Sequence, residues 1–331
     1  MTQLLEVRDL RVGFKTPERE WMALTGVNLQ IGTGEVVGLV GETGCGKTLT
    51  GLSILGLLPR TAQVIGGDIL MNGASLLANS EAEMRKLRGA AVAMIFQNPT
   101  SAFNPVHTIG TQMRLVLDAH LKLDKKERDE RIRSSLASVS MPDVHRVVRS
   151  YPHQLSGGMQ QRAMIAMALL CEPKLLIADE PTTALDVTIA AQVLELMRKL
   201  QDAHGFSVLY ITHDLGVVRR ICDRIVVLYA GRDVETAPTS ELFAHPTHPY
   251  TRALLAAVPR ARARGQALPT ILGTVPSNPG AITGCSFADR CELVIDKCRV
   301  KNPQLQATGP AHLVACHRAQ ETYGAQTAGA A

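Results

Sequence analysis

The hydrophobic pattern near the start of the chain is typical of strands joined by turns. Short apolar runs rich in β-branched residues predict strands at 4–7, 23–31 and 35–40. A glycine-rich loop follows, and we expect an apolar helix that runs to Leu58 and ends at Pro59. Two dipeptides then predict hairpin-like turns, namely Gly66-Gly67 and Asn72-Gly73.

The middle of the chain changes to a charged helical pattern between about residues 105 and 150. The stretch 118–139 carries charges spaced to pair along a solvated helix face. This pattern predicts a helical insert whose basic residues lie on the surface and do not bind a ligand.

Apolar runs alternate with helical stretches again from residue 174 onward. The runs predict strands at 175–179, 207–212 and 224–229. Helices are expected near 188–203 and 215–221. Strands that alternate with helices indicate a parallel α/β sheet.

Turn signals mark a boundary after this alternation. They lie at His245-Pro246, His248-Pro249 and Pro259. An arginine-rich link at 260–264 then precedes a loop-rich tail. We predict a domain of residues 1–250 with a helical insert at about 98–170, and a C-terminal extension of residues 251–331. Its small, polar end, residues 325–331, is expected to be disordered.

The composition is that of a folded chain with a sizeable core. The 331 residues are 46% hydrophobic and 20% charged, which argues against disorder. The net charge of +5 fits a phosphate-bearing ligand or an anionic membrane surface and decides neither. Because no signal peptide and no run of 18 apolar residues is present, we expect a cytoplasmic protein whose membrane role comes through a partner.

Residues 41–48, GETGCGKT, form a candidate phosphate-binding loop. They fit G-x-x-x-x-G-K-[ST] between a predicted strand and a predicted helix, the context that this motif requires. Glycines let backbone N–H groups converge on phosphates, and the helix start adds partial positive charge. Lys47 is expected to contact the β- and γ-phosphates, and the Thr48 hydroxyl to bind magnesium. The strand and helix on either side argue against a simple glycine turn.

Two acids end the predicted strand at 175–179. Buried strands seldom end in this way without a cation or a reaction nearby. Asp179 suits the magnesium shell, and Glu180 suits the orientation or deprotonation of an attacking water. A helix-capping acidic pair is the structural alternative.

A second anion site is predicted at Ser156, Gly157 and Gly158. These residues open a helix rich in alanine and methionine, and a helix start attracts anions. One chain therefore offers two phosphate-binding helix starts but one lysine-bearing loop. A head-to-tail pair of subunits, each completing the site of the other, accounts for both.

The segment LSGG at 155–158 resembles the signature of ABC ATPases, and the other motifs of that family follow the family order. The resemblance implies that Gln97 senses magnesium and water and that His213 contacts the γ-phosphate. It also implies that Asp186 lies at the interface between two ATPase subunits and that Phe14 stacks on adenine.

The site residues are thus predicted in three groups. The catalytic residues are Glu180, His213 and Gln97. The magnesium ligands are Thr48, Gln97 and Asp179. The ATP-binding residues are Phe14, Gly41, Glu42, Thr43, Gly44, Cys45, Gly46, Lys47, Thr48, Thr50, Asp179, Ser156, Gly157, Gly158, Gln160 and Asp186. Cys45 departs from the serine usual in the family, and we expect binding to survive with some thiol sensitivity.

Longer segments resemble the oligopeptide/dipeptide/nickel importer family, in particular its dipeptide/oligopeptide D-type subunit. They are residues 97–110, 151–162, 177–188, 228–235 and 245–255. The implied fold is α/β, a P-loop ABC ATPase core with an antiparallel β portion, a helical insert and a loop-rich C-terminal cysteine extension. The implied function is ATP hydrolysis that energises peptide import, at the cytoplasmic face of the inner membrane as a peripheral subunit.

The resemblance also implies the partners. They are two permease subunits, a second ATPase subunit expected to be a different chain, and an extracytoplasmic solute-binding protein, with no nucleic acid. Within that family, the stretch after Gln97 and the helical insert face the permease.

Four cysteines gather in the C-terminal extension with spacing C-x5-C-x6-C-x17-C, namely Cys285, Cys291, Cys298 and Cys316. The C-x-x-C pair common in zinc sites is absent from this sequence. Four thiolates on a loop-rich segment suit a cluster ligated by four cysteines. The importer resemblance implies a four-iron four-sulfur cluster at these positions. Its role cannot be read from the sequence, and a structural role is the favoured interpretation. Zinc and free thiols are the alternatives.

Other functions compete with peptide import. A soluble ABC ATPase acting on nucleic acid or ribosomes needs long coiled coils or two ATPase halves, and this sequence has neither. A regulatory module without hydrolysis disagrees with the presence of Glu180 and His213. The same machine importing nickel, glutathione or an opine-like solute stays open, because this subunit does not select the cargo.

Overall fold

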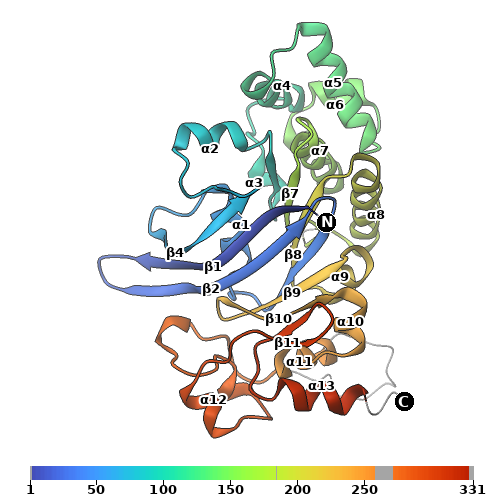
Figure 1. The fold of residues 1–331 in the computed structure, drawn as a ribbon. Coiled ribbons are helices and arrows are strands. Elements are labelled where there is room, and N and C mark those ends of the chain that lie inside the picture. Colours follow the sequence, from blue (N-terminus) through green and yellow to red (C-terminus); the bar gives the residue numbers. More distant parts are fainter. Residues whose placement is uncertain (1, 184, 258–270, 328–331) are drawn as a thin grey trace. The chain divides into compact units, whose positions relative to one another are not determined.

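The structure is a computed structural model that describes residues 2–183, 185–257 and 271–327 (Figure 1). The arginine-rich link at 260–264 lies outside the described residues. The chain divides into two compact units. The first consists mainly of Gly32–Glu35 and Ala78–Tyr210, and the second contains Gln3–Ile31, Val36–Leu77 and the chain from Ile211 onward.

Long antiparallel strands begin the second unit (Figure 1). The strand β1 (Gln3–Lys15) pairs antiparallel with β4 (Ala62–Met71), and β2 (Glu20–Gly32) lies beside β1 in the sheet. The strand β5 (Ala74–Ser75) pairs with the end of β4 across Asn72-Gly73. The predicted turn at Asn72-Gly73 is therefore confirmed.

The predicted turn at Gly66-Gly67 is wrong, because both glycines lie inside β4. The register of β4 against β1 shifts here, between Arg8 and Arg11. Gly67 has a φ of 84°, and a Cβ atom at this position would lie 2.3 Å from the Asp9 carbonyl oxygen. The glycine pair therefore permits an irregularity within a strand and does not end the strand.

The core strands of the second unit carry the predicted parallel pairing. The strand β3 (Val36–Val40) is buried along its whole length and pairs parallel with β9 (Arg224–Tyr229). The strand β10 (Arg232–Pro238) runs antiparallel to β9. The helix α9 (Leu215–Ile221) of this unit has the predicted bounds, and so has the strand β8 (Ser207–Thr212), whose residues 207–210 belong to the first unit.

The helix after the glycine-rich loop, α1 (Lys47–Leu55), is shorter than predicted. Gly56 adopts the left-handed conformation with a φ of 61°, and its N–H bonds to the carbonyls of Leu52 and Ser53. A glycine in this conformation is a common helix terminator. The helix therefore stops before Leu58, and Pro59 is not what ends it.

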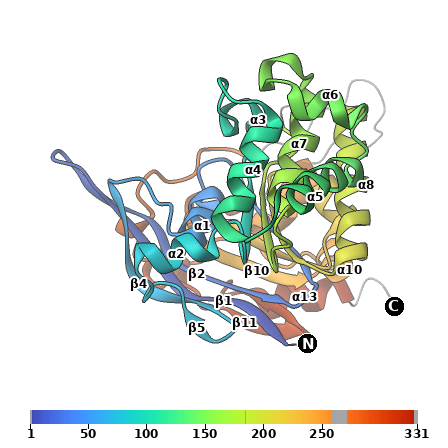
Figure 2. The same ribbon diagram turned by 90° about the horizontal axis from the view of Figure 1, so that it is seen from above.

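The first unit combines a parallel strand pair with many helices, and the helices are labelled in Figure 2. The strand β6 (Val92–Ile95) pairs parallel with β7 (Leu175–Asp179). Its helices are α2 (Glu81–Leu87), α3 (Pro99–Ala102), α4 (Ile109–His120), α5 (Lys125–Ser138), α6 (Val144–Arg149), α7 (Gly157–Leu169) and α8 (Val187–His204). The charged stretch 118–139 is helical in two pieces, because residues 118–120 end α4 and residues 125–138 form α5, while residues 121–124 between them are not helical. The helix α5 buries only Ile132 and Leu136.

The C-terminal segment belongs to the second unit. Its elements are α10 (Thr239–Ala244), α11 (Pro249–Ala257), α12 (Asp296–Val300), β11 (Gln306–Gly309), β12 (His312–Val314) and α13 (Ala319–Thr327). The strand β12 pairs antiparallel with β10. The tail expected to be disordered from residue 325 is helical through Thr327, and residues 328–331 lie outside the described residues.

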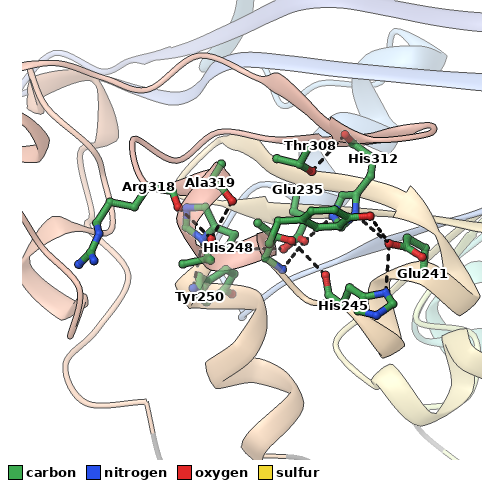
Figure 3. A network of polar contacts seen from close by, with 12 residues as sticks. Glu235, Glu241, His245, His248, Tyr250, Thr308, His312, Arg318 and Ala319 are labelled. Carbon is green, nitrogen blue, oxygen red and sulfur yellow. Dashed lines mark hydrogen bonds and ion pairs between the residues drawn. The ribbon is translucent and has the colours of Figure 1, made fainter. Parts of the chain in front are cut away.

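A buried polar network fastens β12 to the rest of the second unit (Figure 3). Glu235 and His312 are fully buried, and their Oε1 and Nε2 atoms lie 2.8 Å apart. The carboxylate of Glu235 also accepts hydrogen bonds from the backbone N–H groups of Thr247 at 2.7 Å and His248 at 2.9 Å. Burial lowers the pKa of His248 to about 4, so this imidazole stays neutral at pH 7. A buried carboxylate with several donors anchors its surroundings firmly.

Among the described residues, no helix is long and apolar enough to cross a bilayer.

Candidate nucleotide-binding site

The phosphate-binding loop, residues 41–48, connects β3 to α1 in the second unit and depends on its glycines. Gly41, Gly44 and Gly46 have positive φ values of 156°, 85° and 108°. A Cβ atom on Gly41 would lie 2.2 Å from the Leu228 carbonyl oxygen, and one on Gly46 would lie 2.4 Å from Leu24. A side chain at Gly41 or Gly46 would therefore clash, so glycine at both positions lets the loop backbone lie close to the neighbouring strands. A Cβ atom on Gly44 would meet no atom within 4 Å.

Lys47 is buried, with 5% of its surface exposed, and its ammonium group turns back over the loop. The Nζ atom donates to the carbonyls of Gly41 at 2.8 Å and Glu42 at 3.1 Å. The backbone of the loop itself therefore holds this side chain at the loop. A cation placed there suits phosphate oxygens, as the sequence motif predicts.

Three other loop residues differ in exposure. Thr48, the predicted magnesium ligand, is exposed at the start of α1. Thr50 is fully buried, and its hydroxyl donates to the Gly46 carbonyl at 3.0 Å. This hydrogen bond stabilises the end of the loop at the start of α1. The thiol of Cys45 is fully buried, and burial raises its pKa. A buried neutral thiol is unreactive, so the structure does not favour the expected thiol sensitivity.

Two contacts to Glu42 come from residues that sequence reasoning missed. The Glu42 backbone N–H donates to the Tyr250 hydroxyl at 2.8 Å. The Glu42 carboxylate accepts from both terminal nitrogens of Arg290, at 2.8 and 3.0 Å. The sequence signal for Tyr250 is its place in the segment 245–255, and that for Arg290 is its position directly before Cys291.

Phe14 lies on β1 with its ring stacked on Trp21, at a centroid distance of 5.0 Å and an interplanar angle of 4°. Both rings line a surface cavity of about 330 Å³ that Asn278 also lines. A flat aromatic surface beside a cavity suits a planar base. Sequence reasoning did not single out Trp21.

The acidic end of β7 lies in the first unit and includes a strained residue. Asp179 is 4% exposed, and Glu180 has a φ of 46°, a costly conformation outside glycine. Gln97 Nε2 and Thr183 Oγ1 both donate to Glu180 Oε2, at 3.1 and 2.9 Å. The structure therefore brings two of the predicted catalytic residues, Gln97 and Glu180, into direct contact.

The signature loop, residues 156–158, begins α7 in the first unit. Ser156 is the N-cap, and its hydroxyl accepts from the Met159 N–H at 3.4 Å. Ser156 and Gly157 are exposed, and a Cβ atom on Gly157 would meet no atom within 4 Å. An exposed helix start of this kind is accessible to an anion.

Gln160 lies on the first turns of α7 and is 7% exposed. Its Nε2 atom donates to the carbonyls of Pro152 at 2.9 Å and Leu155 at 3.2 Å. Its Oε1 atom accepts from the Thr100 hydroxyl at 2.9 Å. Gln160 therefore supports the signature loop through a buried amide.

The two remaining predicted residues lie at helix starts. Asp186 is the exposed N-cap of α8, and its carboxylate accepts from the Ile189 N–H at 2.9 Å. His213 is exposed between β8 and α9 in the second unit, next to Asp214, which caps α9. The second unit thus holds the phosphate-binding loop, Thr50, Phe14 and His213, and the first unit holds the other predicted residues of the nucleotide site.

The four cysteines of the extension form one electrostatically coupled group. Burial, together with the neighbouring Cys298, Cys316 and Cys291, raises the pKa of Cys285 to about 11. The described part of the chain contains no group of three or more His, Cys, Asp or Glu side chains placed to hold a metal ion.

Known families match both parts of the chain. The profile of the ABC transporter family matches residues 24–183, and that of the oligopeptide/dipeptide transporter C-terminal region matches residues 234–298. The probable peptide ABC transporter ATP-binding protein y4tR of Sinorhizobium fredii is 52% identical over 320 residues, 96% of each chain. The dipeptide transport ATP-binding protein DppD of Bacillus subtilis is 45% identical over 96% of this chain and 95% of its own.

Solved structures agree with the fold. A dimeric ATP-binding cassette in a post-hydrolysis state, bound to ADP and phosphate, has a TM-score of 0.64 and 28% sequence identity, over 71% of this chain and 99% of that chain. The structure of cbiO1 from Clostridium perfringens has the same TM-score at 26% identity, over 74% of this chain and 92% of its own.

The fold and the phosphate-binding loop therefore define an ATP-hydrolysing ABC cassette with a mixed α/β fold. With matches over nearly its whole length, the chain belongs to the family of ATP-binding subunits of oligopeptide/dipeptide ABC transporters.

Proposed function

We propose that this chain hydrolyses ATP to energise the import of peptides, as a peripheral subunit at the cytoplasmic face of the inner membrane. The observation that carries the proposal is the joint match of the ATPase part and the C-terminal region to the peptide-transporter family. Relatives named for peptide, dipeptide and oligopeptide transport span nearly the whole chain.

The proposed assembly contains two permease subunits, a second ATPase subunit and an extracytoplasmic solute-binding protein, and no nucleic acid. In it, residues 1–250 act as the ATPase domain, with the insert at about 98–170, and residues 251–331 act as the extension. The exposed signature loop supports a head-to-tail pairing, because an accessible helix start can meet the γ-phosphate held by Lys47 of a second subunit.

The proposed chemistry divides the site residues by role. The backbone of the phosphate-binding loop and Lys47 bind the ATP phosphates, and Phe14 stacks on adenine. Thr48, Gln97 and Asp179 hold magnesium, which neutralises charge on the phosphates. Glu180 orients or deprotonates the attacking water, and His213 contacts the γ-phosphate. The hydrogen bond from Gln97 Nε2 to Glu180 Oε2 supports this division, because the two side chains to which the proposal gives neighbouring roles are in direct contact.

Peptide import is tested by uptake of a labelled dipeptide and a labelled oligopeptide in cells whose own copy of the gene is deleted. We expect the wild-type chain to restore uptake and the Glu180→Gln chain to fail, since import needs hydrolysis. Expression of the Glu195→Gln variant, changed at an exposed acid on α8, is the matched control and should restore uptake. If the deletion cells keep peptide uptake but lose nickel or glutathione uptake, the transporter imports that solute instead of peptides.

We also propose that Cys285, Cys291, Cys298 and Cys316 hold a four-iron four-sulfur cluster. The loops fit this group, because Cys285, Cys291 and Cys316 each accept a backbone N–H from the residue two positions later, Phe287, Leu293 and Arg318. Such N–H donors favour the thiolate form and tune cluster sulfurs. A cluster of four irons spreads its ligands farther apart than a single tetrahedral ion does, so the lack of a single-ion group among the described residues does not exclude it.

The cluster is tested by anaerobic purification followed by iron, sulfide and zinc analysis and an absorbance spectrum. About four irons per chain with broad visible absorption are expected. The Cys298→Ser variant should lose most of the iron, while Cys171→Ser, changed at a half-buried cysteine outside the extension, should keep it. Stoichiometric zinc, or no metal, would overturn the proposal and leave the ATPase assignment unchanged.

A further inference from the structure

We propose that Arg290, in the C-terminal extension, is a positioning residue for the phosphate-binding loop of the same chain. Through a bidentate ion pair, it neutralises and orients Glu42 so that the loop can accept the phosphates of ATP. The inference rests on nucleotide binding at residues 41–48 and does not depend on the cargo or on a metal cluster.

All three guanidinium nitrogens of Arg290 are engaged. The two terminal nitrogens donate to the two Glu42 carboxylate oxygens at 2.8 and 3.0 Å, and Nε donates to the Leu272 carbonyl at 2.8 Å. The group also lies 5.7 Å from the ring centroid of Tyr229 and 5.8 Å from that of Phe287. Only 7% of the Arg290 side chain is exposed. A planar guanidinium whose nitrogens are all hydrogen-bonded holds the carboxylate that it pairs with in one orientation.

Glu42 is the only acidic residue in the loop sequence GETGCGKT. A carboxylate within a loop that cradles phosphates repels them, and repulsion between charges is strong where the protein shields them from water. The Glu42 side chain is 27% exposed, so solvent screens it only in part. The guanidinium of Arg290 cancels this charge and turns the carboxylate toward the extension.

A second contact fixes the backbone of the same residue. The Glu42 N–H donates to the Tyr250 hydroxyl, and Tyr250 is itself fully buried. The Tyr250 N–H in turn donates to His248 Nδ1 at 3.1 Å, within the buried network that holds β12 (Figure 3). Both the side chain and the backbone of Glu42 are therefore set by residues beyond position 248, outside the phosphate-binding motif.

The test measures the affinity of the full-length chain for the fluorescent analogue TNP-ATP, with competition by ATP. We expect Arg290→Ala to weaken binding by about tenfold, and Arg290→Lys to weaken it less, since lysine keeps the charge but not the fork. Adding Glu42→Gln to Arg290→Ala should restore binding to within a few-fold of wild type, because the repelling charge is then gone. The control Arg299→Ala, changed at a largely exposed arginine paired with Asp289, should bind normally.

Thermal unfolding of each variant separates positioning from simple support of the extension. If Arg290 only supports the extension, Arg290→Ala lowers Tm while its affinity is unchanged, or Glu42→Gln fails to restore affinity. Either result overturns the proposal. The variant Lys47→Ala serves as the reference for loss of the nucleotide site, so failure of nucleotide binding as such is recognised separately.

Discussion

Replacing Glu180 with glutamine is expected to reduce ATP turnover by roughly 10²- to 10⁴-fold, the range in which a positioned general base contributes to a reaction. Glutamine keeps the size of the side chain and an oxygen that can accept from Gln97 and Thr183, which now hold Oε2 of Glu180. It lacks the negative charge needed to draw a proton from water. The measurement is release of phosphate by the purified protein in the presence of magnesium.

The same variant should keep its affinity for ATP and accumulate as an ATP-bound dimer. In the proposed mechanism ATP holds two subunits together and hydrolysis releases them, so blocking hydrolysis traps the closed pair. Size-exclusion chromatography with and without ATP reports this. The Glu195→Gln control should behave as wild type, and unchanged turnover in Glu180→Gln would remove Glu180 from the role of base.

Replacing Lys47 with alanine is expected to weaken ATP binding by at least about tenfold, and turnover with it. Charge-assisted hydrogen bonds to phosphate are roughly twice as strong as neutral ones, and this ammonium is already held at the loop by the Gly41 and Glu42 carbonyls. Binding of TNP-ATP and phosphate release measure the two effects. A steeper loss of turnover than of affinity would indicate that Lys47 acts mainly in the transition state.

The matched control is Lys199→Ala, which removes an exposed lysine paired with Glu195 on α8. A surface pair of this kind contributes little, so affinity and turnover should stay at wild-type values. Unaltered ATP affinity in Lys47→Ala would contradict the assignment of residues 41–48 as the phosphate-binding loop.

The sequence predicted local structure well wherever the signal is itself local. The strands β7, β8 and β9 and the helix α9 have the expected bounds, because each is a short apolar or amphipathic run with clear breakers on both sides. The phosphate-binding loop was recognisable because its glycines, lysine and threonine are contiguous. Where a glycine has two possible uses, the local pattern misled, as at Gly66-Gly67 inside β4.

The sequence by itself thus determined the class of protein and the contiguous parts of its nucleotide site. Only the tertiary structure decided which distant residues support that site. Arg290 lies 248 positions from Glu42, and Tyr250 lies 208 positions from it, so no periodicity or spacing connects them. Their contacts exist because the C-terminal segment packs within the same unit as the phosphate-binding loop, and burial there brings a guanidinium and a hydroxyl onto one loop residue.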